Sequence, residues 1–201
     1  MSLTSRFVTH EVENQPVPLR DYNVWTSDTA LREAVEREGA GWAGDHLEEY
    51  GELAGGRLVD VGFTANENKP KLRSFDRYGR RIDEVEFHPA YHELMTEAMR
   101  YGMNGFAWRN ANRAGAHVAR AAVMYIGSQA DAGVGCPMSM TYAAIPALRH
   151  APALAEKWIP KLISTEYDPR SVPMEEKKGC TIGMGMTEKQ GGSDVRANTT
   201  R

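Results

Sequence analysis

The stretch AGAHVARAAVMYIGSQADA, residues 114–132, is the clearest helical pattern in the chain and indicates its fold class. Its apolar residues recur every three or four positions, so they share one face of an α-helix. They are Ala114, Val118, Ala121, Ala122, Tyr125 and Ile126. Gly133 follows and predicts the end of this helix. A helix with one apolar face must bury that face, so the fold needs further helices around it.

Helices are predicted on the C-terminal side of this stretch. One begins near Pro137 and carries the apolar set Met140, Ala144, Ile145 and Leu148. Pro146 is expected to kink or shorten it, because proline removes a hydrogen bond inside a helix. Another spans residues 152–162.

Helices are also predicted on the N-terminal side. Pro89 suits the first turn of a helix whose stripe is Tyr91, Leu94, Met95, Ala98 and Met99. Ser27 and Asp28 offer caps to an earlier helix that ends at Gly39, and residues 45–54 form a helix stopped by Gly55-Gly56. Residues 27–165 are therefore predicted to form an antiparallel helical bundle with short loops.

Two segments lack this pattern. Residues 1–26 are expected to be an extended tail, because Pro16 and Pro18 block a helix. Residues 55–88 are expected to be irregular, with a turn at Tyr78-Gly79. Six basic residues stand against two acidic ones between Glu67 and Arg81. This loop is either simply solvated or faces an anion, such as phosphate, or a neighbouring subunit.

The character of the chain changes from residue 166 onward. Residues 180–186 alternate apolar side chains with glycine and predict a strand. Residues 166–201 are therefore interpreted as the start of a β domain. The predicted fold class is mainly α: an antiparallel helical bundle followed by the first strand of a β domain.

Composition excludes several classes of protein. The net charge of −3 provides no global basic field for nucleic acid or membranes. Cys136 and Cys180 stand 44 residues apart without a CxxC pair, which fits a reducing compartment. Neither a secretory signal nor an apolar stretch of membrane-spanning length is visible. A cytoplasmic protein without a membrane partner is expected.

The segment Thr187-Glu188-Lys189-Gln190-Gly191-Gly192-Ser193-Asp194 follows the predicted strand. Adjacent glycines let a backbone approach a ligand closely, and successive N–H groups can surround an anion. The hydroxyls of Thr187 and Ser193 add hydrogen-bonding groups. The segment suits a phosphate or the rim of a heterocycle, but the eight residues taken alone favour the turn of a hairpin. It matches neither a Walker A loop nor a Rossmann turn.

Other candidate sites carry weaker signals. His88 and His92 have a spacing that metals use, but no third ligand accompanies them, so no metal site is predicted. Cys136 is interpreted as a small buried thiol at a helix start rather than a nucleophile. The four tryptophans are expected to pack in the core or at an interface.

The glycine segment resembles the T-E-P-x-A/G-G-S-D element of the acyl-CoA dehydrogenase family, and most closely the alkylation-response flavoprotein branch of that family. In the family this element follows the first strand of a middle β domain, after a helical domain. The resemblance extends over essentially the whole chain. It is carried by residues 9–12, 14–16, 31–42, 78–83, 87–89 and 183–194.

The resemblance implies FAD as the cofactor. The positions it assigns to FAD binding are Met184, Gly185, Met186, Thr187, Glu188, Lys189, Gln190, Gly191, Gly192 and Ser193. Within this set it implies that Thr187 contacts the flavin ring and Ser193 the diphosphate. Lys189 stands where the family has proline, so the loop loses a fixed φ angle and gains a charge.

The resemblance also implies an activity, the FAD-dependent oxidation of acyl-CoA thioesters at Cα–Cβ. Family members use a glutamate base from a C-terminal helical domain, which is expected beyond residue 201. No catalytic residue is therefore assigned, and the 201-residue chain alone is expected to be inactive. The alternative is a flavin-containing protein that binds and protects double-stranded DNA in the alkylation-damage response, through the missing C-terminal region. A homotetramer is expected at full length.

Overall fold

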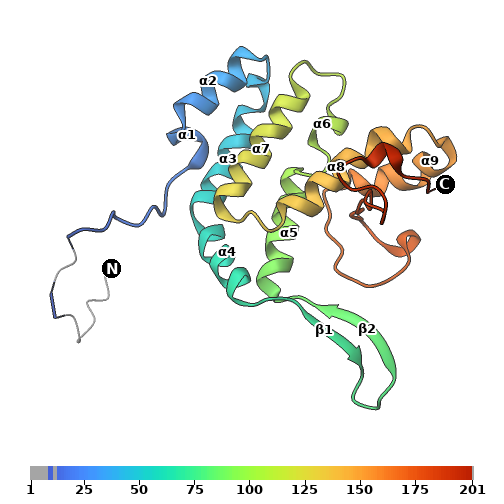
Figure 1. Cartoon of the computed structure of the whole chain (residues 1–201). Helices are drawn as coiled ribbons and strands as arrows, with labels where there is room; N and C mark the ends of the chain where they lie inside the picture. Colours follow the sequence, from blue (N-terminus) through green and yellow to red (C-terminus); the bar gives the residue numbers. More distant parts are fainter. Residues whose placement is uncertain (1–8, 11–12, 201) are drawn as a thin grey trace.

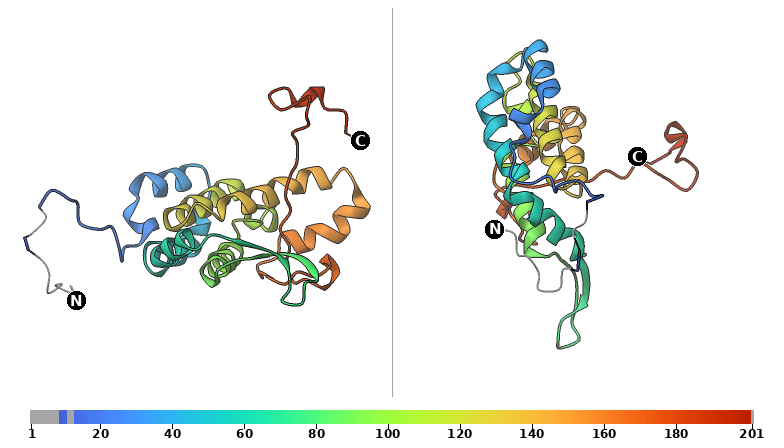
Figure 2. Two further views of the ribbon diagram at one scale, coloured as in Figure 1. Left: turned by 60° about the horizontal axis from the view of Figure 1, so that its bottom comes forward. Right: turned by 90° about the vertical axis from the view of Figure 1, so that its left-hand side faces the viewer.

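The computed structural model describes residues 9–10 and 13–200. A body of helices carries one projecting β-hairpin (Figure 1), and the C-terminal segment extends away from that body (Figure 2). The α-helices are α1 Val24–Ser27, α2 Thr29–Arg37, α3 Gly44–Gly55, α4 Arg57–Glu67, α5 Pro89–Tyr101, α6 Phe106–Arg109, α7 Ala116–Ala130, α8 Gly135–Leu148 and α9 Pro152–Leu162. Short 3-10 turns are η1 Gly41–Ala43, η2 Met174–Glu176 and η3 Val195–Ala197. The strands are β1 Lys71–Phe75 and β2 Arg81–Glu86.

The predicted helices are confirmed, and so is the helical fold class. Helix α9 occupies the expected residues, and α7 begins and ends within two residues of the expected range. Asp28 caps α2 by accepting a hydrogen bond from the Leu31 backbone N–H at 2.8 Å. Helix α8 runs through Pro146 and ends at Leu148. The sequence pattern placed these helices well because each buries one apolar face.

Two hydrophobic clusters hold the helices together. The larger joins α1, α3, α4, α5 and α7, and its fully buried members include Leu47, Met99 and Ile126. The smaller joins α8 and α9 around Ile145, Leu162 and Cys180. Each of the four tryptophans packs in or against one of these clusters, as expected.

The prediction for residues 55–88 was wrong. Gly56 does end α3, but α4 follows at once, and an antiparallel hairpin of β1 and β2 follows α4. Leu58 and Gly62 give α4 its buried face, and the backbone of Gly62 lies so close to Ala130 that a Cβ would collide with it. That contact with α7 is tertiary, so the local pattern could not show it. The predicted turn at Tyr78-Gly79 is confirmed, with φ +78° at Gly79.

Two more differences concern the ends of the chain. The predicted tail contains α1, whose Val24 and Trp25 are buried. The part of this prediction that concerns residues 1–8 and 11–12 lies outside the described residues. Residues 180–186 form no strand in the part of the chain that the structure describes. A strand needs a hydrogen-bonded neighbour, and the described residues provide none beside this segment.

None of the helices among the described residues combines the length and the apolar character that a membrane crossing needs.

Candidate flavin-facing loop and an adjoining cavity

The segment that leads to the glycine loop is anchored on α8 and α9. The backbone N–H of Cys180 donates to the carbonyl of Lys161 at 3.1 Å, and the N–H of Ile182 donates to the hydroxyl of Thr141 at 3.1 Å. The Ile182 side chain packs on the cluster around Leu162. Beyond this point the chain leaves the helical body and ends in a small folded loop (Figure 2).

Glu188 closes the loop. Its backbone N–H and carbonyl exchange hydrogen bonds with Gly191 at 3.0 and 3.2 Å. Its carboxylate accepts the backbone N–H groups of Thr199 and Thr200 at 3.0 and 2.7 Å. These donors, together with the Thr200 hydroxyl, lower the pKa of Glu188. The carboxylate is therefore a structural clamp, and its oxygens are already occupied.

The glycines of the loop have different roles. Gly191 is buried, and a Cβ there would collide with Asn198 and lie 2.8 Å from the carbonyl of Asp194. Gly183 and Gly185, in contrast, face open space. Gly191 is thus required by the packing of the loop itself, whereas the backbone at Gly185 is free for close approach by a ligand.

Apart from Glu188, the side chains assigned to the cofactor are exposed. Thr187, Lys189, Gln190 and Ser193 are exposed, and Met184 and Met186 expose 45% and 61% of their surface. Neither the Thr187 nor the Ser193 hydroxyl has a hydrogen-bond partner within residues 13–200. The loop therefore offers free hydroxyls, an open glycine backbone and apolar thioethers. That donor set fits a flat heterocycle carrying phosphates.

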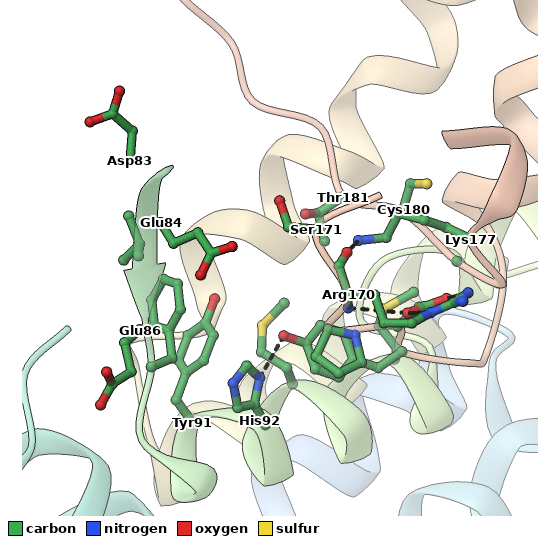
Figure 3. A pocket seen from close by; sticks show the side chains of 18 residues that line it. Asp83, Glu84, Glu86, Tyr91, His92, Arg170, Ser171, Lys177, Cys180 and Thr181 are labelled. Carbon is green, nitrogen blue, oxygen red and sulfur yellow. Dashed lines mark hydrogen bonds and ion pairs between the residues drawn. The ribbon is translucent and has the colours of Figure 1, made fainter. Parts of the chain in front are cut away.

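A cavity of about 720 Å³ lies on another part of the fold, and none of residues 184–193 lines it. It is bounded by β2, the start of α5 and the segment 167–181 (Figure 3). His92 Nδ1 and the Tyr167 hydroxyl lie 2.9 Å apart across it. Burial raises the pKa of Tyr167 to about 12 and lowers the pKa of His92. At neutral pH the phenol is therefore protonated and the imidazole uncharged, and the tautomer of His92 sets which of the two donates the hydrogen bond.

The structure gives His88 and His92 separate roles. His88 caps α5 by accepting from the Ala90 N–H at 3.2 Å, while His92 pairs with Tyr167. No trio of His, Cys, Asp or Glu side chains in the described part of the chain is arranged to hold a metal ion. The partner of His92 comes from 75 residues away, so no spacing rule could find it.

Asp168 and Arg170 brace the wall of the cavity, although no sequence pattern singled them out. Arg170 donates to the buried Asp168 carboxylate at 2.9 and 2.7 Å, and the Lys178 N–H adds a third bond at 3.1 Å. These donors hold the pKa of Asp168 well below its usual range. The only available signal was an acid and an arginine two positions apart around Pro169.

The expectation for Cys136 was wrong. Its thiol lies in the first turn of α8 and is exposed, whereas Cys180 is buried in the α8–α9 cluster. Position at a helix start does not determine burial, because the direction in which the side chain points depends on the neighbouring helices.

The comparisons with known proteins agree on one family. The family profile of the adaptive response protein AidB N-terminal domain matches residues 14–169. The acyl-CoA dehydrogenase homologue AidB of Escherichia coli (strain K12) is 48% identical over 96% of this chain. Acyl-CoA dehydrogenase family member 11 of Caenorhabditis elegans is 25% identical over 74%. The chain spans only 36% and 24% of these two relatives.

Solved structures support the fold. Bd2924 in its apo form superposes with a TM-score of 0.76 at 28% identity, over 90% of this chain and 35% of that one. Caenorhabditis elegans ACDH-11 in complex with C11-CoA gives a TM-score of 0.74 over 99% of this chain and 34% of that one. The latter is 21% identical, so it supports the fold alone. On its sequence and its fold, the chain belongs to the AidB N-terminal domain family, within the acyl-CoA dehydrogenase family.

Proposed function

We propose that this chain provides the helical domain and one flavin-binding loop of an FAD-dependent, acyl-CoA dehydrogenase-like flavoprotein. The whole protein would oxidise acyl-CoA thioesters at Cα–Cβ, with FAD as the hydride acceptor. Residues 184–193 would bind the cofactor: Thr187 through its hydroxyl beside the ring, and Ser193 through a phosphate oxygen. The catalytic base belongs to the part of the relatives that this chain does not span.

One observation carries the proposal: among the described residues the hydroxyls of Thr187 and Ser193 and the backbone of Gly185 have no partner, although Glu188 closes the fold of the loop. A loop that is held by its own hydrogen bonds and exposes polar groups without protein partners is pre-organised for a ligand, because binding requires little further ordering of the loop. Membership of the acyl-CoA dehydrogenase family supports a flavin as that ligand. The C11-CoA in the related ACDH-11 structure supports an acyl-CoA as the second ligand.

The test uses the full-length protein reconstituted with FAD. Flavin absorption at one equivalent per chain is expected, and Thr187→Val and Ser193→Ala should each weaken FAD binding by about three- to tenfold, the value of one hydrogen bond. Thr181→Val is the matched control, because Thr181 is exposed but lies before the loop. If the protein takes up no FAD, or if Thr181→Val loses as much FAD affinity as the two loop variants, the proposed role of the loop is refuted.

The reaction is tested separately. Anaerobic bleaching of the bound flavin by an acyl-CoA is expected. A full-length protein that holds flavin, is not bleached and binds duplex DNA in a salt-sensitive manner would instead support the DNA-protection function.

A further inference from the structure

The tip of the hairpin, residues 76–80, is an exposed cationic cluster. Tyr78 exposes 72% of its surface, and the guanidinium carbons of Arg77 and Arg80 lie 5.2 and 5.8 Å from its ring centroid. Asp76 is used by the turn itself, since it accepts the N–H groups of Tyr78 and Arg80 at 2.8 and 2.9 Å. Neither Arg77 nor Arg80 forms an ion pair with any residue the structure describes. The tip therefore presents an aromatic ring and two free positive charges.

The strands behind the tip have one unburied apolar face. Leu72 and Val85 are paired across the hairpin and expose 66% and 51% of their surface. The other face carries charged pairs such as Arg73 with Glu86 at 2.7 Å. An isolated two-stranded hairpin is marginal in water unless such a face packs against something. The hairpin therefore exposes both an apolar face and a charged tip that a partner molecule could bury.

A second cavity, of about 720 Å³, has the opposite character. Four carboxylates, those of Asp21, Glu49, Glu52 and Glu97, line it together with Arg57 and Arg100. The arginines are paired to Glu97 at 3.3 and 3.4 Å, and Arg100 reaches Glu49 at 3.2 Å. Asp21 and Glu52 have no cationic partner in the described part of the chain. Two free negative charges in this cavity thus match the two free positive charges of the tip.

Tip and cavity lie at opposite ends of the α4–α5 pair. The hairpin joins the end of α4 to the start of α5, whereas Arg57 at the start of α4 and Tyr101 at the end of α5 line the cavity. The hairpin points away from the body (Figure 1). A chain therefore cannot place its own tip in its own cavity, and contact requires another molecule.

We propose that the hairpin tip docks into the acidic cavity of a second copy of this chain. Tyr78 enters beside the half-buried Tyr22 and Leu53, and Arg77 and Arg80 face Asp21 and Glu52. Because tip and cavity lie at opposite ends of one helix pair, a two-fold axis makes both contacts at once and closes a dimer. The apolar hairpin face then lies along the partner's α4.

The surface of α4 and the charge of the chain favour this occupant. Phe63 on α4 exposes 62% of its surface and would meet the hairpin of the second copy. Residues 21–67, which include most of the cavity lining, carry 11 acidic residues against 3 basic ones, so this part of the molecule attracts a cationic segment such as the tip. The inference does not depend on the proposed flavin chemistry.

Charge reversal tests the contact in the 201-residue chain. Sedimentation at low ionic strength is expected to show a dimer. Arg77→Glu with Arg80→Glu, or Asp21→Lys with Glu52→Lys, should each weaken self-association by roughly tenfold or more through like-charge contact. Mixing the two variants should restore a heterodimer, because each reversed tip then meets a reversed cavity. Circular dichroism verifies that each variant folds.

The control is Arg149→Glu with Lys157→Glu, which removes the same charge from exposed positions outside the interface and should leave the dimer intact. A monomeric wild-type chain, a dimer unaffected by tip reversal, or no recovery in the mixture would overturn the proposal. So would tip-dependent binding of duplex DNA by a monomer.

A cross-link tests the geometry. In a Cys136→Ser background, Tyr78→Cys and Leu53→Cys chains are mixed and oxidised, and a disulfide between copies is expected. Ala153→Cys, exposed on α9, replaces Leu53→Cys in the control and should not cross-link to the tip. Equal cross-linking of both pairs would contradict docking in the cavity.

Discussion

The hydroxyl of Thr141 on α8 accepts the backbone N–H of Ile182 at 3.1 Å, at the point where the chain leaves the helical body for the glycine loop. The same hydroxyl donates to the carbonyl of Pro137 at 2.7 Å, so both of its hydrogen-bonding roles are used. Thr141 is fully buried. One side chain thus links the interior of α8 to the base of the proposed cofactor loop.

Replacing Thr141 by valine is expected to destabilise the chain by about 1–3 kcal/mol, because the Ile182 N–H loses its acceptor in a partly buried place. Urea unfolding followed by circular dichroism measures the change. Thr181→Val, one residue away from the anchored Ile182 and exposed, should have little effect. Equal destabilisation by both variants would mean that the Thr141 bond has no special importance.

Gly191→Ala is expected to disturb the loop, because the new Cβ would collide with Asn198 and approach the carbonyl of Asp194 to 2.8 Å. Gly185→Ala is the matched control, since a Cβ there meets nothing within 4 Å. Limited proteolysis should cut the Gly191 variant faster after residue 183 while the helical body remains intact. Similar cleavage of both variants would contradict the packing role of Gly191.

Asp168 is expected to make stability depend on acid pH. Its pKa is held low in the folded chain by Arg170 and the Lys178 N–H, so its stabilising effect is complete above the unfolded pKa of about 3.9. The effect is lost as the pH falls through the lower folded pKa. Asp168→Asn should therefore be less stable than wild type at pH 7, and the difference should shrink below about pH 4.

Unfolding free energies measured at several pH values test this. Glu166→Gln is a suitable control, because its ion pair with Lys178 is largely exposed and should contribute little. A difference between Asp168→Asn and wild type that stays constant into strong acid would rule out the proposed linkage.

The two cysteines are expected to differ in reactivity. Cys136 is exposed, whereas Cys180 is buried, and burial raises the pKa of the Cys180 thiol. A thiol reagent at neutral pH should label one cysteine rapidly and the second only after unfolding. Cys136→Ser should remove the rapid phase; a rapid phase that persists in this variant would show that Cys180 is accessible.

The local sequence was sufficient wherever structure depends on neighbours along the chain. The apolar face of residues 114–132, the Asp28 cap and the Tyr78-Gly79 turn were predicted from short patterns, and each is found. The hydrogen-bonded turn inside the glycine segment is also local, because Glu188 and Gly191 are three residues apart, but the sequence left open whether the segment is a hairpin turn or a ligand loop. Whether this loop binds a flavin stays a prediction.

Prediction failed where the structure depends on contacts between residues that are distant in the sequence. Helix α4 is buried through Gly62 against α7, and residues 180–186 lack a pairing neighbour in the described chain. His92 forms a hydrogen bond with Tyr167, which is 75 residues away in the sequence. The Ile182 N–H donates to Thr141, which is 41 residues away. Composition and periodicity contain no information on such pairs.

The sequence by itself determined the helical class, most helix positions and the family, because apolar periodicity, caps and extended motifs are properties of consecutive residues. Only the tertiary structure decided which residues meet: the His92–Tyr167 pair, the Asp168 clamp, and the separation of the cationic hairpin tip from the acidic cavity. These three relationships depend on how the helices pack and on where the hairpin projects. Packing and projection are determined by burial and hydrogen bonding over the whole folded chain.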